Sequence, residues 1–264
     1  MITFAAIAPH SPLLLPTIGK EHQKKLKKTL VAYKTLEEDL YASKTDTLLV
    51  LSPHGTILKN AFSLSIAPSY KTNFKEFGDF VTAFTLPTDA HTIEAIRRLR
   101  HDRQDPAPIV GITEEFLDYG VAVPLFFLSQ HLPALRIVPI GVSHLSLGKH
   151  FLVGKNIGKV VQRSTARIGI IASADLAHTL TDAAPGGFSL KGKEFDAKFV
   201  QALRRDDRAG ILKLEETMDD AKACGLRTIA MLFGMIENMN CAAELLSYEG
   251  PFGIGYLTAR FNFR

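Results

Sequence analysis

Apolar residues in this chain follow two patterns. Short continuous apolar runs predict buried strands, whereas an apolar residue at every third or fourth position predicts an amphipathic helix. The runs predict strands at residues 2–8, 47–51, 61–67, 135–142, 167–172, 243–248 and 254–263. Helical spacing predicts helices at residues 20–43, 90–101, 121–132, 147–163, 191–205, 209–218 and 225–237. Strands that alternate with helices predict an α/β fold with a central, mostly parallel sheet and helices on both faces.

A few longer connections separate these elements. Residues 69–89 are rich in Phe, Lys and Gly and are expected to form a surface excursion. Residues 104–108 are expected to form a turn, and residues 182–187 a flexible Gly/Pro segment. Pro124 is expected in the first turn of its helix, where a missing N–H costs nothing. The 264 residues contain no internal repeat and no low-complexity linker, so a single domain over residues 1–264 is predicted.

Three histidines each follow a predicted strand. His10 comes after residues 2–8, His54 after residues 47–51, and His178 six residues after the strand at 167–172. In an open α/β sheet, ligands bind beyond the carboxyl ends of the strands, so these side chains are expected to converge there. Imidazole is the commonest side-chain metal ligand and the usual acid/base near neutral pH. The pattern therefore predicts a metal site with a proton-handling neighbour.

The loops that hold His10 and His54 have restricted backbones. Pro9 and Pro12 flank His10, and their rings fix the backbone angle φ. Gly55 follows His54 and allows close approach of the backbone. Rigid surroundings suit a metal ligand. The alternative is that each histidine only closes the end of its strand through a hydrogen bond.

The other histidines are less distinctive. His178 shares a polar segment with Asp175, which could orient an imidazole beside a metal or simply cap the next turn. His144 also follows a predicted strand, and spacing alone does not exclude it from the site. The remaining histidines lie on or near predicted helices with charged neighbours and are expected at the surface: His22, His91, His101, His131 and His150.

The two cysteines cannot build a disulfide framework, and their spacing fits no cysteine-based zinc motif. Cys224 precedes the predicted helix at 225–237, where the helix N-terminus would stabilise a thiolate and make it a candidate ligand or nucleophile. The alternative for Cys224 is a small buried residue, and Cys241 is expected in the core.

Ser11 and Ser52 neighbour histidines, which leaves a hydrolase as another alternative for the function. No serine matches a nucleophile elbow, however.

Composition and charge exclude some classes of protein. Hydrophobic residues make up 46% and charged residues 22%, as in soluble globular proteins. No apolar run reaches the ~20 residues that span a bilayer, and no basic flank of a signal peptide is present, so a cytoplasmic protein without membrane contact is expected. The net charge is +4. The basic patch at residues 20–28 is expected to be the solvated face of a helix rather than a nucleic-acid surface.

Four loops, in order along the chain, resemble those of the class III extradiol dioxygenase superfamily, which has the LigB-like fold, and of its Memo-like branch. They are Ala-Pro-His-Ser-Pro at 8–12, Leu-Ser-Pro-His-Gly at 51–55, Ser-Ala-Asp-Leu-Ala-His at 173–178 and Ala-Cys-Gly-Leu-Arg at 223–227. The closing Leu-Ser-Tyr-Glu-Gly at 246–250 is similar to that of proteins grouped with the AmmeMemoRadiSam system. The resemblance implies a single α/β domain of LigB-like, or phosphorylase/hydrolase-like, architecture.

The resemblance also implies a chemistry. In the dioxygenase branch, two histidines and a glutamate hold Fe(II) and leave other positions open. By this resemblance His10 and His54 are the two histidine ligands, and His178 is the active-site acid/base that handles the protons of a catechol. The expected function is that of an oxidoreductase that opens a small aromatic ring next to its hydroxyl groups, with Asp175 and Tyr119 supporting the site.

Two positions depart from the dioxygenase pattern. Cys224 aligns with the expected glutamate, as in Memo-like proteins, in which two histidines and a cysteine are implicated in binding copper or iron. Tyr119 stands where many ring-cleaving members have a histidine. The alternative is therefore a Memo-like copper- or iron-binding redox protein without ring cleavage, acting beside a radical-SAM partner.

Fe(II) is the expected metal, and Cu and Zn are alternatives. A homo-oligomer is compatible with the sequence. An oxygen ligand could instead come from one of the acidic residues Glu215, Glu216, Asp219 and Asp220.

Overall fold

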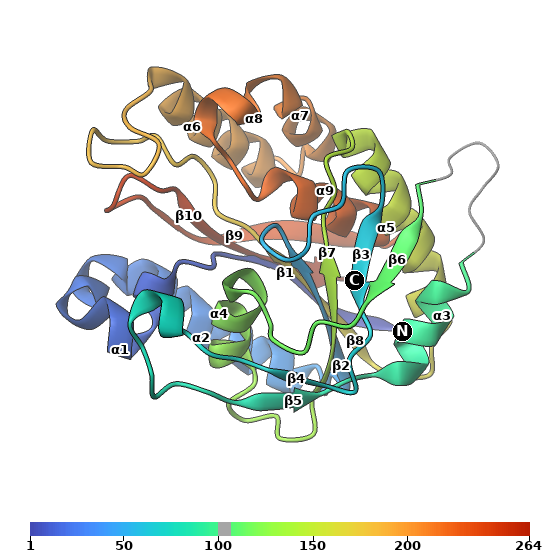
Figure 1. The fold of residues 1–264 in the computed structure, drawn as a ribbon. Coiled ribbons are helices and arrows are strands. Elements are labelled where there is room, and N and C mark those ends of the chain that lie inside the picture. Colours follow the sequence, from blue (N-terminus) through green and yellow to red (C-terminus); the bar gives the residue numbers. More distant parts are fainter. Residues whose placement is uncertain (100–106) are drawn as a thin grey trace.

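The structure, a computed structural model, describes residues 1–99 and 107–264. Within these residues the central sheet has eight strands in the order β6-β3-β7-β2-β8-β1-β10-β9 (Figure 1). Its strands are β1 Ile2–Ala8, β2 Thr47–Ser52, β3 Phe62–Ser65, β6 Ile109–Ile112, β7 Arg136–Gly141, β8 Ile168–Ser173, β9 Cys241–Glu249 and β10 Tyr256–Phe263. A small second sheet pairs β4 Ser69–Lys71 with β5 Thr85–Pro87.

The centre of the sheet is parallel and its flanks are antiparallel. Strands β7, β2, β8 and β1 run parallel to one another. Every residue of β2 and β8 is buried, which explains their continuous apolar runs, because a strand covered on both faces has no solvent side. On one flank β10 and β9 are antiparallel, and on the other β3 is antiparallel to β7 and parallel to β6. The predicted α/β fold with a central sheet is confirmed.

Helices cover both faces of the sheet (Figure 1). Two of them, α2 and α4, pack with one hydrophobic core, and α3 and α5 to α9 pack with the other. The helices are α1 Pro16–Gly19, α2 Lys27–Ala42, α3 Ala90–Arg97, α4 Tyr119–Leu128, α5 Leu147–Gln162, α6 Leu190–Arg204, α7 Arg208–Leu212, α8 Glu215–Ala221 and α9 Leu226–Met235. Short 3₁₀ segments lie at Pro12–Leu14, Lys20–Leu26 and Lys75–Phe77. None of the described helices is long and apolar enough to cross a membrane.

The predicted elements differ from the observed ones mainly in short segments. The helix expected at 20–43 opens as a 3₁₀ segment and becomes α-helical at Lys27. The helix expected at 209–218 is divided into α7 and α8. Strands β4, β5 and β6 were not predicted, because they are three or four residues long and partly exposed, which leaves little apolar pattern to detect. Most of the turn expected at 104–108, and His101, lie outside the described residues.

Close packing against α5 fixes the position of α9. Gly154 and Gly158 lie on α5, and a Cβ atom at these positions would meet the backbone oxygens of Met231 and Met235 at 2.0 and 2.5 Å. Two glycines one helical turn apart therefore let the two helix backbones approach closely. Because α9 starts two residues after Cys224, this contact also sets the position of the Cys224 thiol.

His150 is wrongly predicted as a surface residue, since it is fully buried on the inner face of α5. Its Nδ1 donates to the carbonyl of Ser146 at 2.8 Å, and its Nε2 accepts from the backbone N–H of Ser143 at 3.2 Å. The ring also meets the edge of Phe62. Burial lowers the pKa of His150 to about 4. The neutral imidazole satisfies backbone groups of the loop after β7, a tertiary role that helical spacing does not show.

Candidate metal centre

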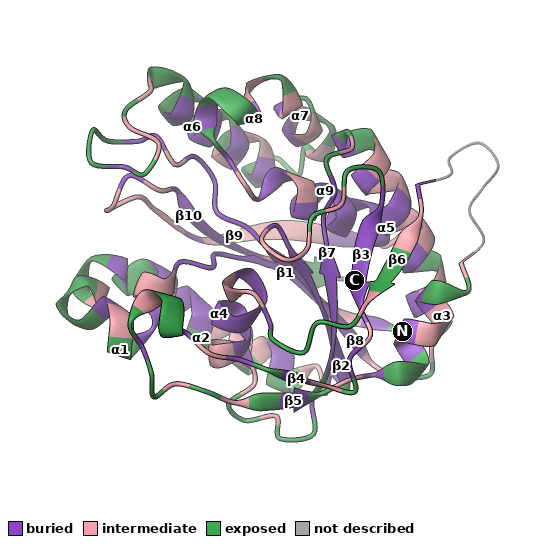
Figure 2. Ribbon diagram, in the orientation of Figure 1, coloured by how far each residue is buried: buried purple, intermediate pink, exposed green. Residues whose placement is uncertain are grey.

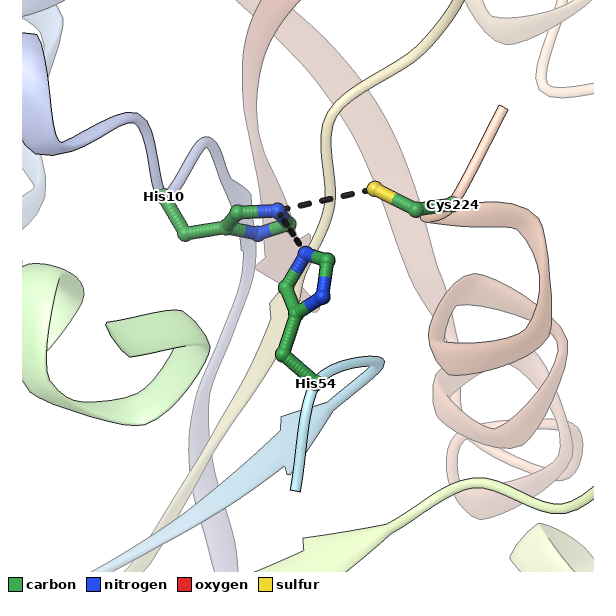
Figure 3. A group of neighbouring side chains, drawn as sticks. All are labelled: His10, His54 and Cys224. Atoms are coloured by element: carbon green, nitrogen blue, oxygen red, sulfur yellow. Dashed lines mark hydrogen bonds between the residues drawn. The ribbon is translucent and has the colours of Figure 1, made fainter. Parts of the chain in front are cut away.

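Two of the histidines lie on loops at the same edge of the sheet, after strands separated by one other strand. His10 follows β1 and His54 follows β2, and β8 lies between these two strands. Cys224 enters from the loop before α9, on one face of the sheet. Figure 3 shows the two imidazole rings and the thiol pointing toward one another. Residues separated by more than 200 positions therefore meet at the carboxyl ends of the parallel strands, where α/β proteins bind ligands.

The three side chains present their ligand atoms to a common point. His10 Nε2 lies 2.9 Å from His54 Nε2 and 3.5 Å from Cys224 Sγ. Across the described residues, these three form the group whose ligand atoms all lie within 4.8 Å of one another. Imidazole nitrogen and thiolate sulfur together suit iron, copper and zinc better than magnesium or calcium. The donor set therefore fits a transition metal.

The tautomer of His10 is fixed by a hydrogen-bond chain that starts at Pro124. Pro124 lies inside α4, not in its first turn as predicted, because Asp118 caps the helix two residues earlier than expected. Proline has no N–H, so it leaves the carbonyl of Gly120, four residues before it, without a helical partner. Ser173 Oγ donates its proton to that carbonyl and must therefore accept from His10 Nδ1, 2.9 Å away.

These hydrogen bonds hold His10 in the neutral tautomer that can bind a metal. With the proton on Nδ1, Nε2 carries a free lone pair directed at His54 and Cys224. Such a contact to the second ring nitrogen orients a ligating histidine and raises its basicity. Ser173 ends β8 and was quoted in the sequence only as part of a loop pattern. The proline within an apolar helical run was the one sequence signal that could have indicated it.

We expect Ser173→Ala to weaken metal binding by about 10- to 100-fold, the range typical for loss of a contact to a ligating histidine. The substitution removes the acceptor for the Nδ1 proton and lets either tautomer form. Competitive titration against a chelator measures the affinity. Ser129→Ala is the matched control, because Ser129 Oγ also donates to a backbone carbonyl of α4, that of Leu125, but does not contact an imidazole. Equal affinities for wild type and Ser173→Ala would contradict this role.

Buried tyrosines hold the His10 loop. The Tyr33 hydroxyl, from α2, donates to the carbonyl of Pro9, and the Tyr256 hydroxyl, from β10, donates to Ser11 Oγ at 3.3 Å. The backbone N–H of His10 donates to Asp175 Oδ1 at 3.1 Å. Three elements distant in sequence therefore fix this loop in addition to its prolines. The roles of the two tyrosines are set by tertiary contacts and have no local sequence signal.

Tyr119 lies directly against His54. The two rings stack with centroids 4.3 Å apart, and the Tyr119 hydroxyl lies 3.1 Å from His54 Nε2. Burial is the main cause that raises the pKa of Tyr119 well above its usual value. The phenol therefore stays protonated and donates hydrogen bonds at neutral pH. Tyr119 is the first residue of α4, and Asp118 caps this helix. The Asp118 carboxylate also accepts from Ser52 Oγ at 2.6 Å, which holds the start of the helix beside the His54 loop.

The site keeps its imidazoles neutral. Burial, followed by the charges that His54 and His178 would carry, lowers the pKa of His10 well below its usual value. Burial and His178 lower the pKa of His54 to about 4. A protonated imidazole cannot coordinate a metal, so these shifts favour the binding-competent form at neutral pH.

His178 is a neutral imidazole beside the two histidines. Its Nδ1 lies 3.0 Å from the carbonyl of Leu176, which can only accept, so the proton is on Nδ1 and Nε2 is the unprotonated nitrogen. Its backbone N–H donates to the carbonyl of Ala221. Burial lowers the pKa of His178. The neutral ring is thus in the form of a general base, outside the three-residue ligand group.

The expectation of a stabilised thiolate at Cys224 is wrong for the metal-free chain. Burial and then the Asp175 carboxylate raise the pKa of the thiol well above its usual range, which outweighs the nearby helix N-terminus. The thiol lies 3.6 Å from the backbone carbonyl of Asp175, toward which it donates. Burial also raises the pKa of Asp175 to about 7, with Oδ2 at 3.5 Å from His10 Nε2. A metal would have to displace the thiol proton.

The other candidate metal ligands named from the sequence lie outside the group formed by His10, His54 and Cys224. His144 is exposed, and Glu215 Oε1 accepts from the backbone N–H of Leu147 at the start of α5. Asp220 pairs with Lys191 on the surface. Glu216 and Asp219 are exposed on α8. None of these acidic residues belongs to the described ligand group.

The fold and the site together define an α/β protein with a candidate transition-metal centre at the carboxyl ends of its parallel strands. The family model for the catalytic LigB subunit of aromatic ring-opening dioxygenase matches residues 4–259. The chain therefore belongs to the LigB family.

Two individual proteins are similar to this chain. Protein CA_C1420 of Clostridium acetobutylicum is 28% identical over 258 residues, which are 95% of this chain and 55% of that protein, so the chain spans about half of its length. The crystal structure of the uncharacterized protein JW3007 from Escherichia coli K12 superposes with a TM-score of 0.65 and 13% identity. It covers 98% of this chain and 99% of that one, a likeness in fold.

Proposed function

We propose that the chain is a metal-dependent oxidoreductase of the extradiol-dioxygenase type, which holds nonheme Fe(II) with His10, His54 and Cys224. The convergence of two neutral imidazoles and a thiol on one point is the observation that carries this proposal. Membership of the LigB family supports it. Iron, when bound, would supply the redox chemistry by which dioxygen opens an aromatic ring.

The remaining residues would handle protons and orientation. His178 Nε2 is unprotonated and would remove a proton from a catechol hydroxyl, as a general base. The Tyr119 hydroxyl would donate a hydrogen bond to an oxygen of the bound substrate. Asp175 would hold the His10 loop through the backbone N–H of His10. The substrate proposed for this chemistry is a small catecholic compound.

The second candidate is a Memo-like copper- or iron-binding redox protein without ring cleavage, with a radical-SAM protein of the AmmeMemoRadiSam group as its partner. Cys224 favours it, because a soft thiolate suits Cu(I). Tyr119 also favours it, because many ring-cleaving members have a histidine where this chain has Tyr119.

Anaerobic titration of the metal-free protein with Fe(II) and Cu(I) separates the two candidates. If Cys224 is a ligand for Cu(I), Cys224→Ser should reduce Cu(I) affinity by about 100-fold or more, because a hydroxyl is a poor ligand for a soft ion. Cys241→Ser is the matched control, since Cys241 is buried in β9 beside Arg208.

The outcome of this titration selects the function. Tight Fe(II) binding, followed by a spectral change on adding catechol without oxygen, would support ring cleavage. A preference for Cu(I) that disappears in Cys224→Ser, with no response to catechol, would support the second candidate. Full retention of both metals in Cys224→Ser would remove Cys224 from the ligand set.

A further inference from the structure

The outermost strand of the sheet, β9, has a free edge. Among the described strands it pairs only with β10, at the end of the strand order. Most of its residues are half-buried, and Figure 2 shows it in pink beside the buried central strands. A strand at a sheet edge presents backbone N–H and C=O groups without partners, which is a template for another strand.

A groove runs along this edge. Helix α2 packs against one face of the sheet and α6 against the other (Figure 1), and residues from both helices line the groove together with residues 245–249 of β9. Its volume is about 750 Å³. The free edge of β9 therefore lies between residues of two helices.

The walls of the groove are strongly basic. Five cationic side chains line it: Lys24, Lys25, Lys27, Lys28 and Arg204. The acidic residue among its lining residues, Glu249, already accepts from the N–H and the hydroxyl of Thr29 at 2.8 and 2.7 Å. The chain as a whole carries a net charge of only +4. Positive charge is therefore concentrated at this groove, and an acidic partner is complementary to it.

A buried hydroxyl in the groove lacks a partner. Ser247 lines the groove and is 7% exposed, and its Oγ has no hydrogen-bond partner in the described structure. The Oγ1 of Thr258, its cross-strand neighbour on β10, is also without one. A buried hydroxyl without a hydrogen bond is destabilising. Both hydroxyl oxygens are buried, so a strand added at this edge would contact the backbone of β9 and not these two side chains.

We propose that this groove binds an extended acidic segment of another polypeptide, which adds to β9 as a further strand. Backbone hydrogen bonds to β9 would provide affinity, and the lysines would select acidic side chains. A second copy of this chain fits less well. Two β9 strands paired about a twofold axis would bring the lysines of one α2 toward those of the other, and like charges repel. This proposal is independent of the metal chemistry.

The probe is a synthetic peptide of roughly twelve residues that alternates Glu and Val, so that one face is acidic and the other apolar. We expect it to bind the full chain. The double variant Lys24→Glu/Lys28→Glu should bind it at least about tenfold more weakly, because two attractions become repulsions. Lys59→Glu/Lys159→Glu is the matched control, with the same change of charge at exposed positions outside the groove.

Backbone pairing is tested separately by N-methylation of every second peptide amide, in each of the two possible registers. Methylation removes the donors on one edge without changing charge, so one register should lose binding by about tenfold or more. Hydrogen exchange should slow at residues 244–249 when the unmodified peptide binds. Binding that tolerates methylation in both registers, or leaves exchange of β9 unchanged, would overturn the proposal and indicate general attraction of polyanions. No binding, or concentration-dependent self-association that protects β9 without peptide, would also overturn it.

Discussion

Replacing His10 or His54 with alanine is expected to reduce the affinity for Fe(II) and for Cu(I) by about 100-fold or more, a larger loss than that from removing a contact to a ligand. Each substitution removes one of three ligand atoms that lie within 4.8 Å of one another. Anaerobic titration with a competing chelator and the metal content of the purified variants measure the effect. His54→Ala is the cleaner test of the two, because His54 is only half-buried.

His144→Ala is the matched control for these variants. His144 follows β7 much as His10 follows β1, but its side chain is exposed and does not belong to the ligand group. We expect its metal affinity to equal that of the wild type. Circular dichroism of all three variants tests whether the fold is retained. If properly folded His10→Ala and His54→Ala bound metal as well as the wild type, the proposed site would be incorrect.

His178→Gln is expected to keep its metal and to lose turnover of a catechol by about 10²- to 10⁴-fold, the usual contribution of a positioned acid/base. Glutamine can still donate to the carbonyl of Leu176, as His178 Nδ1 does, but it cannot accept a proton near neutral pH. Steady-state rates of ring cleavage, together with metal content, separate these two effects. Loss of metal in this variant would make His178 a ligand instead.

The pH dependence of turnover gives a second test of His178. Burial lowers its pKa, so the base form persists below the usual value for histidine, about 6.5. The rate is expected to be independent of pH just above neutrality and to fall as the pH decreases through the lowered pKa and the ring becomes protonated. This acidic limb should be absent from any residual rate of His178→Gln. The same limb in both proteins would assign the titration to another group.

The LigB fold was predictable from local patterns. The runs at residues 47–51 and 167–172 are continuous because β2 and β8 are covered on both faces, and burial on both faces leaves a direct trace in sequence. Helix boundaries were less predictable. The start of α4 depends on the cap at Asp118, which is also hydrogen-bonded to Ser52 from another element. Strand β6 at the opposite edge of the sheet has too few buried residues to be detected.

The positions of His10 and His54 in the site followed from their place after strands, since neighbouring parallel strands end at one edge of the sheet. Cys224 was a candidate ligand from its place before a predicted helix and from a resemblance between short loops, but no local pattern places the start of α9 against that edge. Its thiol was expected to ionise easily, and burial beside Asp175 reverses that expectation. The extent of burial depends on packing of the whole chain and is not visible in a short sequence window.

The sequence by itself determined the α/β class, the order of the main strands and helices, and the two loops that deliver His10 and His54, because periodicity and the rigidity of proline are local properties. Only the tertiary structure decided that Pro124 frees a carbonyl for Ser173, and that Ser173 sets the tautomer of His10. It also showed the basic groove beside β9. Hydrogen-bond partners, burial and charge concentration arise between segments far apart in the chain, and these segments meet only when the sheet has formed.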